Sequence, residues 1–186
     1  MTIILEFELG TWYPVASPVI RGTQIHTTPR WTKGWSISFS FKPLQGNTAH
    51  GNIFHNFVQH PEDPEDTRTL QSVLTIQELS GRSTRLIIRS YVDGDNDYSL
   101  KTDPLVHNQW YSILIKSEKM SNGNYKFSIT IDNSVIHQIE NTTPQAFENV
   151  KTYVSTPLFF EANGYLQNFR LLFKCNLNMH IVYKSF

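Results

Sequence analysis

Hydrophobic and polar residues alternate along several runs of this chain. In residues 35–41 every second position is a large apolar residue, and the positions between them are serines. Residues 111–115 and 125–131 follow a similar period of two. Because successive side chains of a strand point to opposite sides of a sheet, this pattern predicts half-buried β-strands.

Turn-forming residues connect the central runs. Residues 121–124, Ser-Asn-Gly-Asn, tolerate a positive φ and predict an antiparallel hairpin between the runs on either side. Asp-Asn-Ser at 132–134 then leads into a third run at 135–139. The resulting meander over 105–140 has one apolar face, and a second sheet must cover that face.

Further strands are predicted throughout the chain, at residues 3–9, 52–58, 70–79, 85–92, 150–155 and 164–173, with one helical turn at 145–149. Roughly a dozen short strands separated by frequent turns predict an all-β fold, a single antiparallel β-sandwich or jelly roll. We expect one domain over residues 1–174. A tail over 175–186 follows it, and either pairs at a sheet edge or extends freely.

Composition narrows the function. The chain has 186 residues, enough to bury a core without metal ions or disulfide bonds, and its formal net charge is zero. The charge therefore indicates neither a nucleic-acid partner nor an anionic membrane, and no apolar stretch is long enough to span a bilayer. Cys175 is the single cysteine, and the first residues carry acids and lack a basic leader. We expect an extracellular mature form, with a cytosolic protein as the alternative.

Four segments carry a family resemblance: Trp-Ser-Ile-Ser-Phe-Ser-Phe-Lys-Pro at 35–43, Asn-Gln-Trp at 108–110, the Asp-Asn turn at 132–133, and Gly-Tyr-Leu-Gln-Asn-Phe-Arg at 164–170. Through these segments the chain resembles the concanavalin A-like superfamily, and within it the laminin G-like domains. Residues 142–155 are similar to a segment of a secreted group found in marine invertebrates. The resemblance implies a jelly roll, a fold that hosts lectins, adhesion modules, hydrolases and lyases.

The chain departs from that group directly after Ser155. The group continues with Asp-Pro-Trp, an acid and an aromatic suited to an ion or a sugar ring, whereas Thr156-Pro157-Leu158 stands here. A calcium site built on that acid is therefore not expected. Any stacking role at this place passes to Phe159 or Phe160.

Catalytic motifs of the superfamily are incomplete in this chain. Retaining hydrolysis needs two carboxyl groups at a fixed spacing on a strand, and no strand here has them. Gln24-Ile25-His26 is similar to the Gln-Ile-His of alginate lyases, but the Arg-x-Glu-Leu-Arg and Tyr-x-Lys-x-Gly-x-Tyr strands of those enzymes are missing. We expect a protein that binds and does not catalyse, with a polysaccharide lyase as a further alternative.

An acidic turn is the candidate for calcium. Asp93-Gly94-Asp95-Asn96-Asp97 places oxygen ligands at alternating positions, as calcium prefers, but the same residues also suit a plain hairpin turn. We favour the turn and keep Asp95, Asp97 and Asp103 as candidate calcium ligands. No cofactor is otherwise indicated.

Carbohydrate is the expected ligand, bound at a rim site formed by residues 44–69 and 93–103. Lectins place an exposed aromatic ring beneath the apolar face of a sugar, and Trp12 and Trp31 occupy Pro/Thr-rich loops with no periodic reason to be buried. The predicted ligand-binding residues are Trp12, Trp31, His50, His60, Asp66, Arg68, Asp93, Asp95, Asn96 and Asp97.

Two further expectations concern partners. Glycans or glycoproteins are the expected ligands, and a protein-binding adhesion or matrix module is the main alternative. A homodimer through an edge strand or the apolar tail 179–186 is plausible, because unpaired strand edges invite pairing. Asn141-Thr142-Thr143 is the single N-glycosylation sequon, relevant for a secreted chain.

Overall fold

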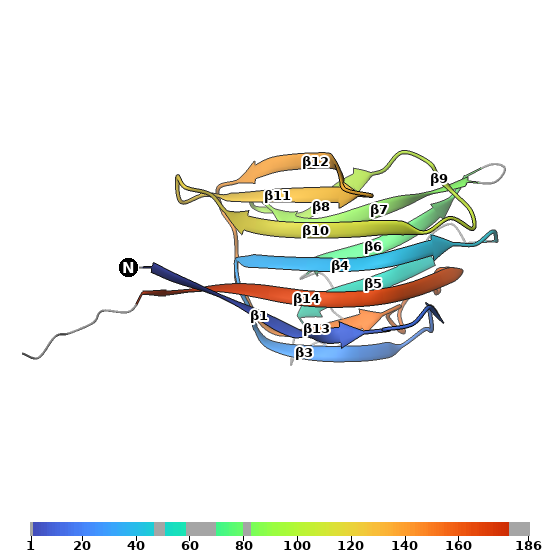
Figure 1. Ribbon diagram of the computed structural model, residues 1–186, viewed down its shortest axis with the longest axis horizontal. Helices are drawn as coiled ribbons and strands as arrows, with labels where there is room; N and C mark the ends of the chain where they lie inside the picture. Colours follow the sequence, from blue (N-terminus) through green and yellow to red (C-terminus); the bar gives the residue numbers. More distant parts are fainter. Residues whose placement is uncertain (1, 47–50, 59–69, 80–82, 179–186) are drawn as a thin grey trace, which may run out of the picture.

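The computed structural model describes residues 2–46, 51–58, 70–79 and 83–178, and within them the protein consists of two antiparallel sheets of seven strands each with no helix. In Figure 1 the two sheets lie one behind the other as the layers of a sandwich. The predicted all-β sandwich is thus confirmed. In the described ranges no helix is long and apolar enough to cross a membrane.

Sheet A contains both terminal strands. Its order is β1 (Thr2–Trp12), β14 (Gly164–Asn178), β4 (Gly34–Pro43), β10 (Tyr111–Lys119), β11 (Tyr125–Ile131) and β12 (Ser134–Asn141), with β2 (Ser17–Pro18) paired to β14. Sheet B has the order β3 (Thr23–Trp31), β13 (Phe147–Val154), β5 (Gly51–Val58), β6 (Leu70–Glu78), β7 (Ser83–Val92) and β8 (Asp95–Lys101), with β9 (Leu105–Val106) paired to β7.

Aromatic side chains from both sheets form the centre of the core. Phe39 of β4 and Phe169 of β14 belong to sheet A, and Phe54 of β5 reaches them from sheet B. The ring centroid of Phe54 lies 5.6 Å from that of Phe39 and 5.7 Å from that of Phe169, both in edge-to-face contact. Such pairs add about 0.5–1.5 kcal/mol beyond the burial of their area. The alternation predicted for residues 35–41 is therefore the inner face of β4.

The predicted meander is present as β10, β11 and β12. The turn between β11 and β12 is formed by Asp132 and Asn133, whose φ angles are 49° and 66°. Two consecutive positive φ values belong to the turn type whose twist matches a two-residue hairpin. The turn residues thus fix the register that keeps Phe127, Ile129 and Ile131 in the core.

Several boundaries differ from the sequence prediction. β1 continues past Gly10 to Trp12 through a bulge, and β14 continues to Asn178, where it pairs with Thr2. The pairing of β14 with β4 ends at Lys174, so residues 175–178, the first part of the predicted tail, pair with β1 alone. The helical turn predicted at 145–149 is wrong, because β13 begins at Phe147. Residues 179–186 of the predicted tail lie outside the described residues.

Candidate functional site

Trp31 does not act as an exposed aromatic residue, and the prediction that placed it in a loop is wrong. It is the last residue of β3, pairs with Phe147 of β13 and is 0% exposed. Its ring makes edge contacts with Trp35 at 5.6 Å and with Phe173 at 4.9 Å. Both partners belong to sheet A, so Trp31 packs between the two sheets.

Trp12 is a half-buried residue at the end of β1 rather than a loop residue. Its ring lies 5.7 Å from that of His26 and 6.4 Å from that of Phe169, a core residue. Trp12 therefore packs against the core near the edge formed by β1 and β3, where it covers apolar surface.

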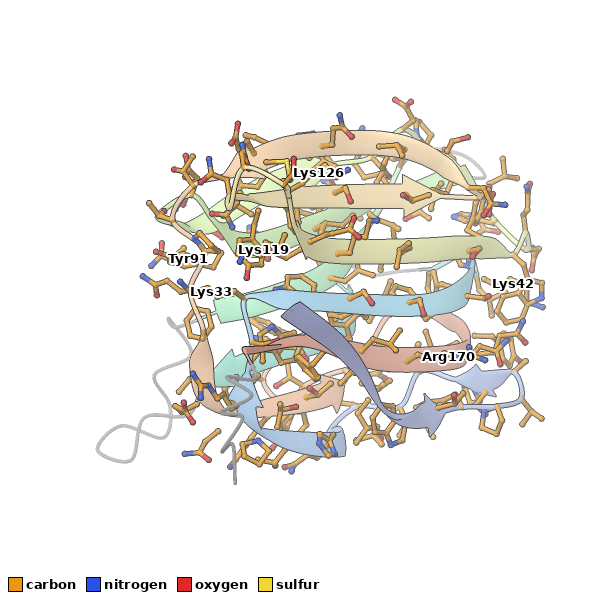
Figure 2. All side chains as sticks on the ribbon, turned by 60° about the vertical axis from the view of Figure 1, so that its left-hand side comes forward. Lys33, Lys42, Tyr91, Lys119, Lys126 and Arg170 are labelled. Atoms are coloured by element: carbon orange, nitrogen blue, oxygen red, sulfur yellow. The ribbon has the colours of Figure 1, made fainter. Side chains whose placement is uncertain are left out.

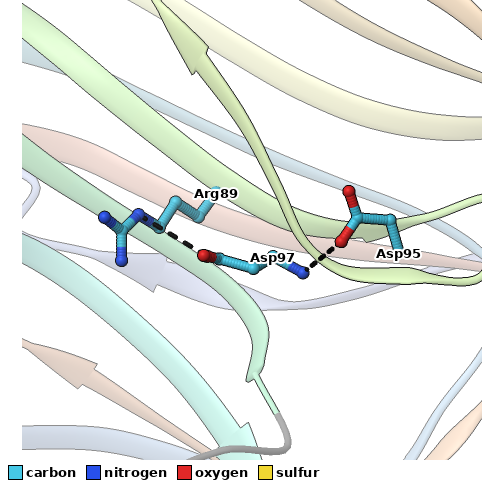
Figure 3. Close-up of polar contacts among 3 residues, drawn as sticks. All are labelled: Arg89, Asp95 and Asp97. Atoms are coloured by element: carbon cyan, nitrogen blue, oxygen red, sulfur yellow. Dashed lines mark hydrogen bonds and ion pairs between the residues drawn. The ribbon is translucent and has the colours of Figure 1, made fainter.

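The acidic residues after β7 form a turn that satisfies its own polar groups. Asp95 accepts a hydrogen bond of 2.8 Å from the backbone amide of Asp97, and the Asp97 carboxylate lies 3.6 Å from Arg89 (Figure 3). The hydroxyl and the backbone amide of Thr142 donate to Asp93 at 2.6 and 2.9 Å and lower the pKa of that carboxyl. Asn96 is exposed between the two acids. Since the Arg89–Asp97 pair is exposed, it contributes little to stability.

The calcium candidates do not come together. Asp95 and Asp97 lie at the start of β8, whereas Asp103 follows its other end. In the described ranges no group of three or more His, Cys, Asp or Glu side chains is arranged to hold a metal ion. The structure therefore gives the favoured turn interpretation a geometric basis.

The expected rim site combined two opposite ends of the sandwich. At one end of sheet B, Gly51 of β5 pairs with Ile76 of β6. At the other end, Ser72 of β6 pairs with Asn56 of β5 on one side and with Ser90 of β7 on the other. Residues 44–46 adjoin the first end, whereas the turn at 93–94 adjoins the second. The described parts of 44–69 and 93–103 therefore do not form one rim. His50, His60, Asp66 and Arg68 lie outside the described residues.

The structure instead brings four rings together on the outer face of sheet B. This aromatic row consists of Tyr153 of β13, Phe57 and His55 of β5, and Phe159 of the segment after β13. Tyr153 and Phe57 are stacked at 5.6 Å with an interplanar angle of 10°, and His55 lies 4.9 Å from Phe57. Phe159 lies 5.9 Å from His55 and is 42% exposed. The row therefore ends in a ring that solvent reaches.

Strand alternation explains why these rings face outward. Phe54 points into the core, so its neighbour His55 points to the opposite face of β5. Tyr153 is the residue opposite His55 on β13 and shares this face. Paired residues on neighbouring strands lie side by side, which places the row across two adjacent strands.

Polar groups border the row at its Tyr153 end. The Tyr153 hydroxyl donates to the Gln24 side-chain oxygen at 2.8 Å, and the Gln24 amide donates to the Thr27 hydroxyl at 3.0 Å. Gln24 and Thr27 are exposed and Tyr153 is half-buried. A half-exposed ring with an amide and a hydroxyl beside it offers both an apolar face and hydrogen-bonding groups.

His55 is a buried polar group in the middle of the row. The residue is 0% exposed, and neither ring nitrogen has a hydrogen-bond partner in the described part of the protein. Burial lowers the pKa of His55 from 6.5 to about 4, so the ring is neutral at pH 7. A neutral imidazole offers one donor and one acceptor, and both are unused here.

Asn52 holds the segment that carries Phe159. Its side-chain oxygen accepts from the Thr156 amide at 3.0 Å, and its side-chain amide donates to the carbonyls of Phe54 and Leu74 at 3.2 and 3.3 Å. Its backbone amide also donates to the Phe160 carbonyl at 2.7 Å. Asn52 is fully buried and thereby fixes where the Phe159 segment leaves the sheet.

Gln24 and His26 lie on opposite faces of β3. A bulge inserts Ile25, so that Gln24 pairs with Tyr153 and His26 with the adjacent Thr152. Gln24 consequently faces outward beside Tyr153, and His26 contacts Trp12. The two polar side chains of this tripeptide therefore do not face a common site.

Solved structures of known proteins resemble this chain at low sequence identity. The heptameric SAP-like pentraxin from Limulus polyphemus matches with a TM-score of 0.54 and 12% identity, covering 83% of this chain and 74% of the pentraxin. The carbohydrate recognition domain of Emp47p matches with a TM-score of 0.51 and 10% identity, covering 91% and 87%. A polysaccharide lyase of family 18 matches with a TM-score of 0.52 and 7% identity, covering 95% and 88%.

Sequence comparison adds no closer relative. No family model and no curated protein sequence matches this chain. At the identities above, the structural likeness concerns the arrangement of the strands, which lectins and lyases share. The chain shares its antiparallel jelly-roll fold with these proteins, and this fold is consistent with the concanavalin A-like resemblance seen in the sequence.

Proposed function

We propose that this chain is a non-catalytic carbohydrate-binding protein and that its binding site is the aromatic row on the outer face of sheet B. The observation that carries the proposal is the continuous row from the half-buried Tyr153 to the exposed Phe159, bordered by Gln24 and Thr27. A sugar ring has an apolar C–H face and a periphery of hydroxyls, so it needs this combination of groups.

The residues have separate roles in this proposal. Phe159 supplies the accessible ring against which a sugar stacks. Gln24 and Thr27 exchange their mutual hydrogen bond for bonds to sugar hydroxyls at little cost, because both are already exposed. His55 supplies a donor and an acceptor to a hydroxyl that enters beneath Phe159, and that contact would satisfy its unpaired nitrogens.

A glycan array, followed by titration of the best ligand, tests the proposal. Phe159→Ala should weaken binding at least tenfold, or about 1.4 kcal/mol. Phe160→Ala is the matched control, because Phe160 is the neighbouring residue, is 66% exposed and contacts Arg21 instead of His55. Equal losses in the two variants, or no glycan signal at all, would overturn the proposal. An unchanged array after addition of a chelator is expected, since the row contains no carboxylate.

The absence of catalysis is part of the same proposal and has its own assay. A lyase acting on uronate polymers produces an unsaturated sugar that absorbs in the ultraviolet. The separation of Gln24 and His26 onto opposite faces supports a protein without this activity. A rise in absorbance that disappears in His26→Ala would contradict the proposal.

The proposal also covers the number of sugar sites per assembly and the location of the protein. Individual sugar sites are weak, so useful binding needs several sites, and a homodimer would provide them. The edge strand β12 exposes Val135 and Ile136, at 60% and 42%, which supports pairing with β12 of a second copy. Ile136→Lys should then convert a dimer to a monomer in analytical ultracentrifugation.

An extracellular location suits a glycan ligand, and secretion of the natural protein into culture medium tests this location.

A further inference from the structure

Lys42 lies between two aromatic rings on the outer face of sheet A, on the opposite side of the sandwich from the aromatic row. Its ammonium nitrogen is 5.4 Å from the ring centroid of Trp110 and 5.0 Å from that of Tyr165. An ammonium group within about 6 Å of a ring face is attracted by the ring quadrupole. Two such rings therefore hold the Lys42 side chain in place.

The three side chains form one row across three neighbouring strands. Phe41 faces the core, so Lys42 faces outward, and Tyr165 is its partner on β14. On the other side, Tyr111 pairs with Phe41 and points inward, so Trp110 faces outward beside Lys42. Trp110 and Tyr165 are thus separated by two strand spacings, about 10 Å. A short oligosaccharide covers that distance.

A second row of polar side chains runs parallel to the first. On the same three strands, Ser40 pairs with Gln167 on one side and with Ser112 on the other. These residues precede or follow the first row by two positions, so they point to the same outer face. Ser112 is exposed, and Ser40 and Gln167 are half-buried. The two rows together offer two aromatic faces, two serine hydroxyls, one amide and one cation.

The charge of Lys42 is not neutralised locally. Within the described residues no carboxylate forms an ion pair with it, whereas Lys116 on the same face is 2.8 Å from Glu118. In Figure 2, Lys42 lies far from Lys33 and Lys119, whereas Arg170 of β14 lies on the Lys42 side. Arg170 pairs with Ser38, two positions from Ser40 on β4, so it lies beyond the second row and not between the two rings. A ligand that pairs with Lys42 therefore meets one positive charge between two apolar faces.

We infer that Trp110, Lys42 and Tyr165 form a second binding site, specific for an acidic saccharide whose carboxylate or sulfate group pairs with Lys42. The flanking sugar rings stack on Trp110 and Tyr165. Hydroxyls of the same sugars bind Ser40, Ser112 and Gln167. The site is independent of the aromatic row, because it belongs to the other sheet.

Calorimetric titration with matched ligands tests this site. Tetragalacturonate should bind at least tenfold more tightly than its fully methyl-esterified form, which has the same rings without the charges. A sulfated galactan tetrasaccharide reveals whether sulfate serves as well as carboxylate. Tetraglutamate, which has a similar charge but no sugar rings, should bind at least tenfold more weakly than tetragalacturonate. Equal binding of tetraglutamate would assign the face to acidic peptides and overturn the inference.

Substitutions separate the contributions of charge and ring. Lys42→Met should remove the preference for tetragalacturonate over its ester, and Trp110→Ala should weaken both ligands. Lys126→Met is the matched control, because it removes a lysine from the same face without a ring contact in the described residues, and it should leave both affinities unchanged. Thermal unfolding verifies that each variant is folded.

Phe159→Ala should not affect binding at this site, so failure of this inference and failure of the proposed function are distinguishable. Wild-type affinity in Lys42→Met, or no binding of either acidic saccharide, would overturn the inference.

Discussion

Acidification should destabilise this protein through His55. The imidazole is buried without a hydrogen-bond partner in the described residues, and its pKa falls from 6.5 to about 4 in the folded state. Above pH 6.5 the ring is neutral in both the folded and the unfolded chain, so it contributes no pH dependence. Below pH 6.5 the unfolded chain binds a proton that the folded protein does not. The free energy of unfolding therefore decreases as the pH is lowered, and it stops changing below about pH 4.

The lowered pKa of His55 sets how much unfolding free energy is lost on acidification. Each pKa unit corresponds to about 1.4 kcal/mol, and a shift from 6.5 to about 4 therefore removes about 3 kcal/mol of stability across this range. A domain of this kind has about 5–15 kcal/mol in total, so the loss is easily measured. Asp93, whose pKa is lowered, adds a loss at lower pH in the same direction. A comparison of variants is needed to isolate the histidine.

Urea unfolding of the wild type and of His55→Phe at several pH values between 4 and 7.5 provides that comparison. The difference in unfolding free energy between the two proteins should change by about 3 kcal/mol over this range, because the phenylalanine ring cannot bind a proton. His26→Phe is the control, since His26 is only half-buried. This variant should retain most of the wild-type pH dependence. Parallel curves for the wild type and His55→Phe would refute the reasoning.

Three further predictions concern buried positions. Gly164→Ala should destabilise the protein by about 1–3 kcal/mol in urea unfolding, because the added Cβ would lie 2.6 Å from the Phe41 ring. Asn52→Ala should lower stability by about 1–3 kcal/mol, since it leaves the Thr156 amide and two carbonyls without their buried partner, and amide hydrogen exchange should accelerate at Thr156. Folded protein secreted from eukaryotic cells should carry no glycan at Asn141 by intact mass spectrometry, because this side chain is 3% exposed and accepts a turn amide.

The strands with a clear period of two could be predicted from the sequence, and those at the edges could not. Residues 35–41 and 125–131 each face a core on one side only, so burial imposes the alternation directly. The sequence does not predict β3, because Pro29 and several threonines interrupt its pattern of apolar and polar residues. Proline is tolerated there because β3 is an edge strand of sheet B, where one side of the backbone needs no partner.

The candidate site was less predictable, because it depends on which face of a strand a residue occupies. Trp31 follows a proline-containing run, and the sequence therefore predicts a loop there, yet the second sheet covers it completely. Phe159 could be suspected, since it follows the segment where the resembling group places an acid and a tryptophan. Its neighbour in space, His55, is far from it in the sequence, and His55 is also far in the sequence from its strand partner Tyr153. Their meeting depends on the pairing of β5 with β13, which no local pattern specifies.

The binding groups on the two outer faces of the sandwich come from different kinds of segment, and this difference affects which ligand each face can bind. On sheet B a segment pinned by Asn52 lays Phe159 against the strands, so the site depends on a connecting segment. On sheet A the row around Lys42 consists almost entirely of strand positions, so its spacing is set by the sheet itself. A strand-built site is the more rigid of the two and suits a ligand whose sugar rings lie at a fixed spacing. A protein with both would bind a neutral sugar on one side and an acidic sugar on the other, and a single chain would then bridge two glycans.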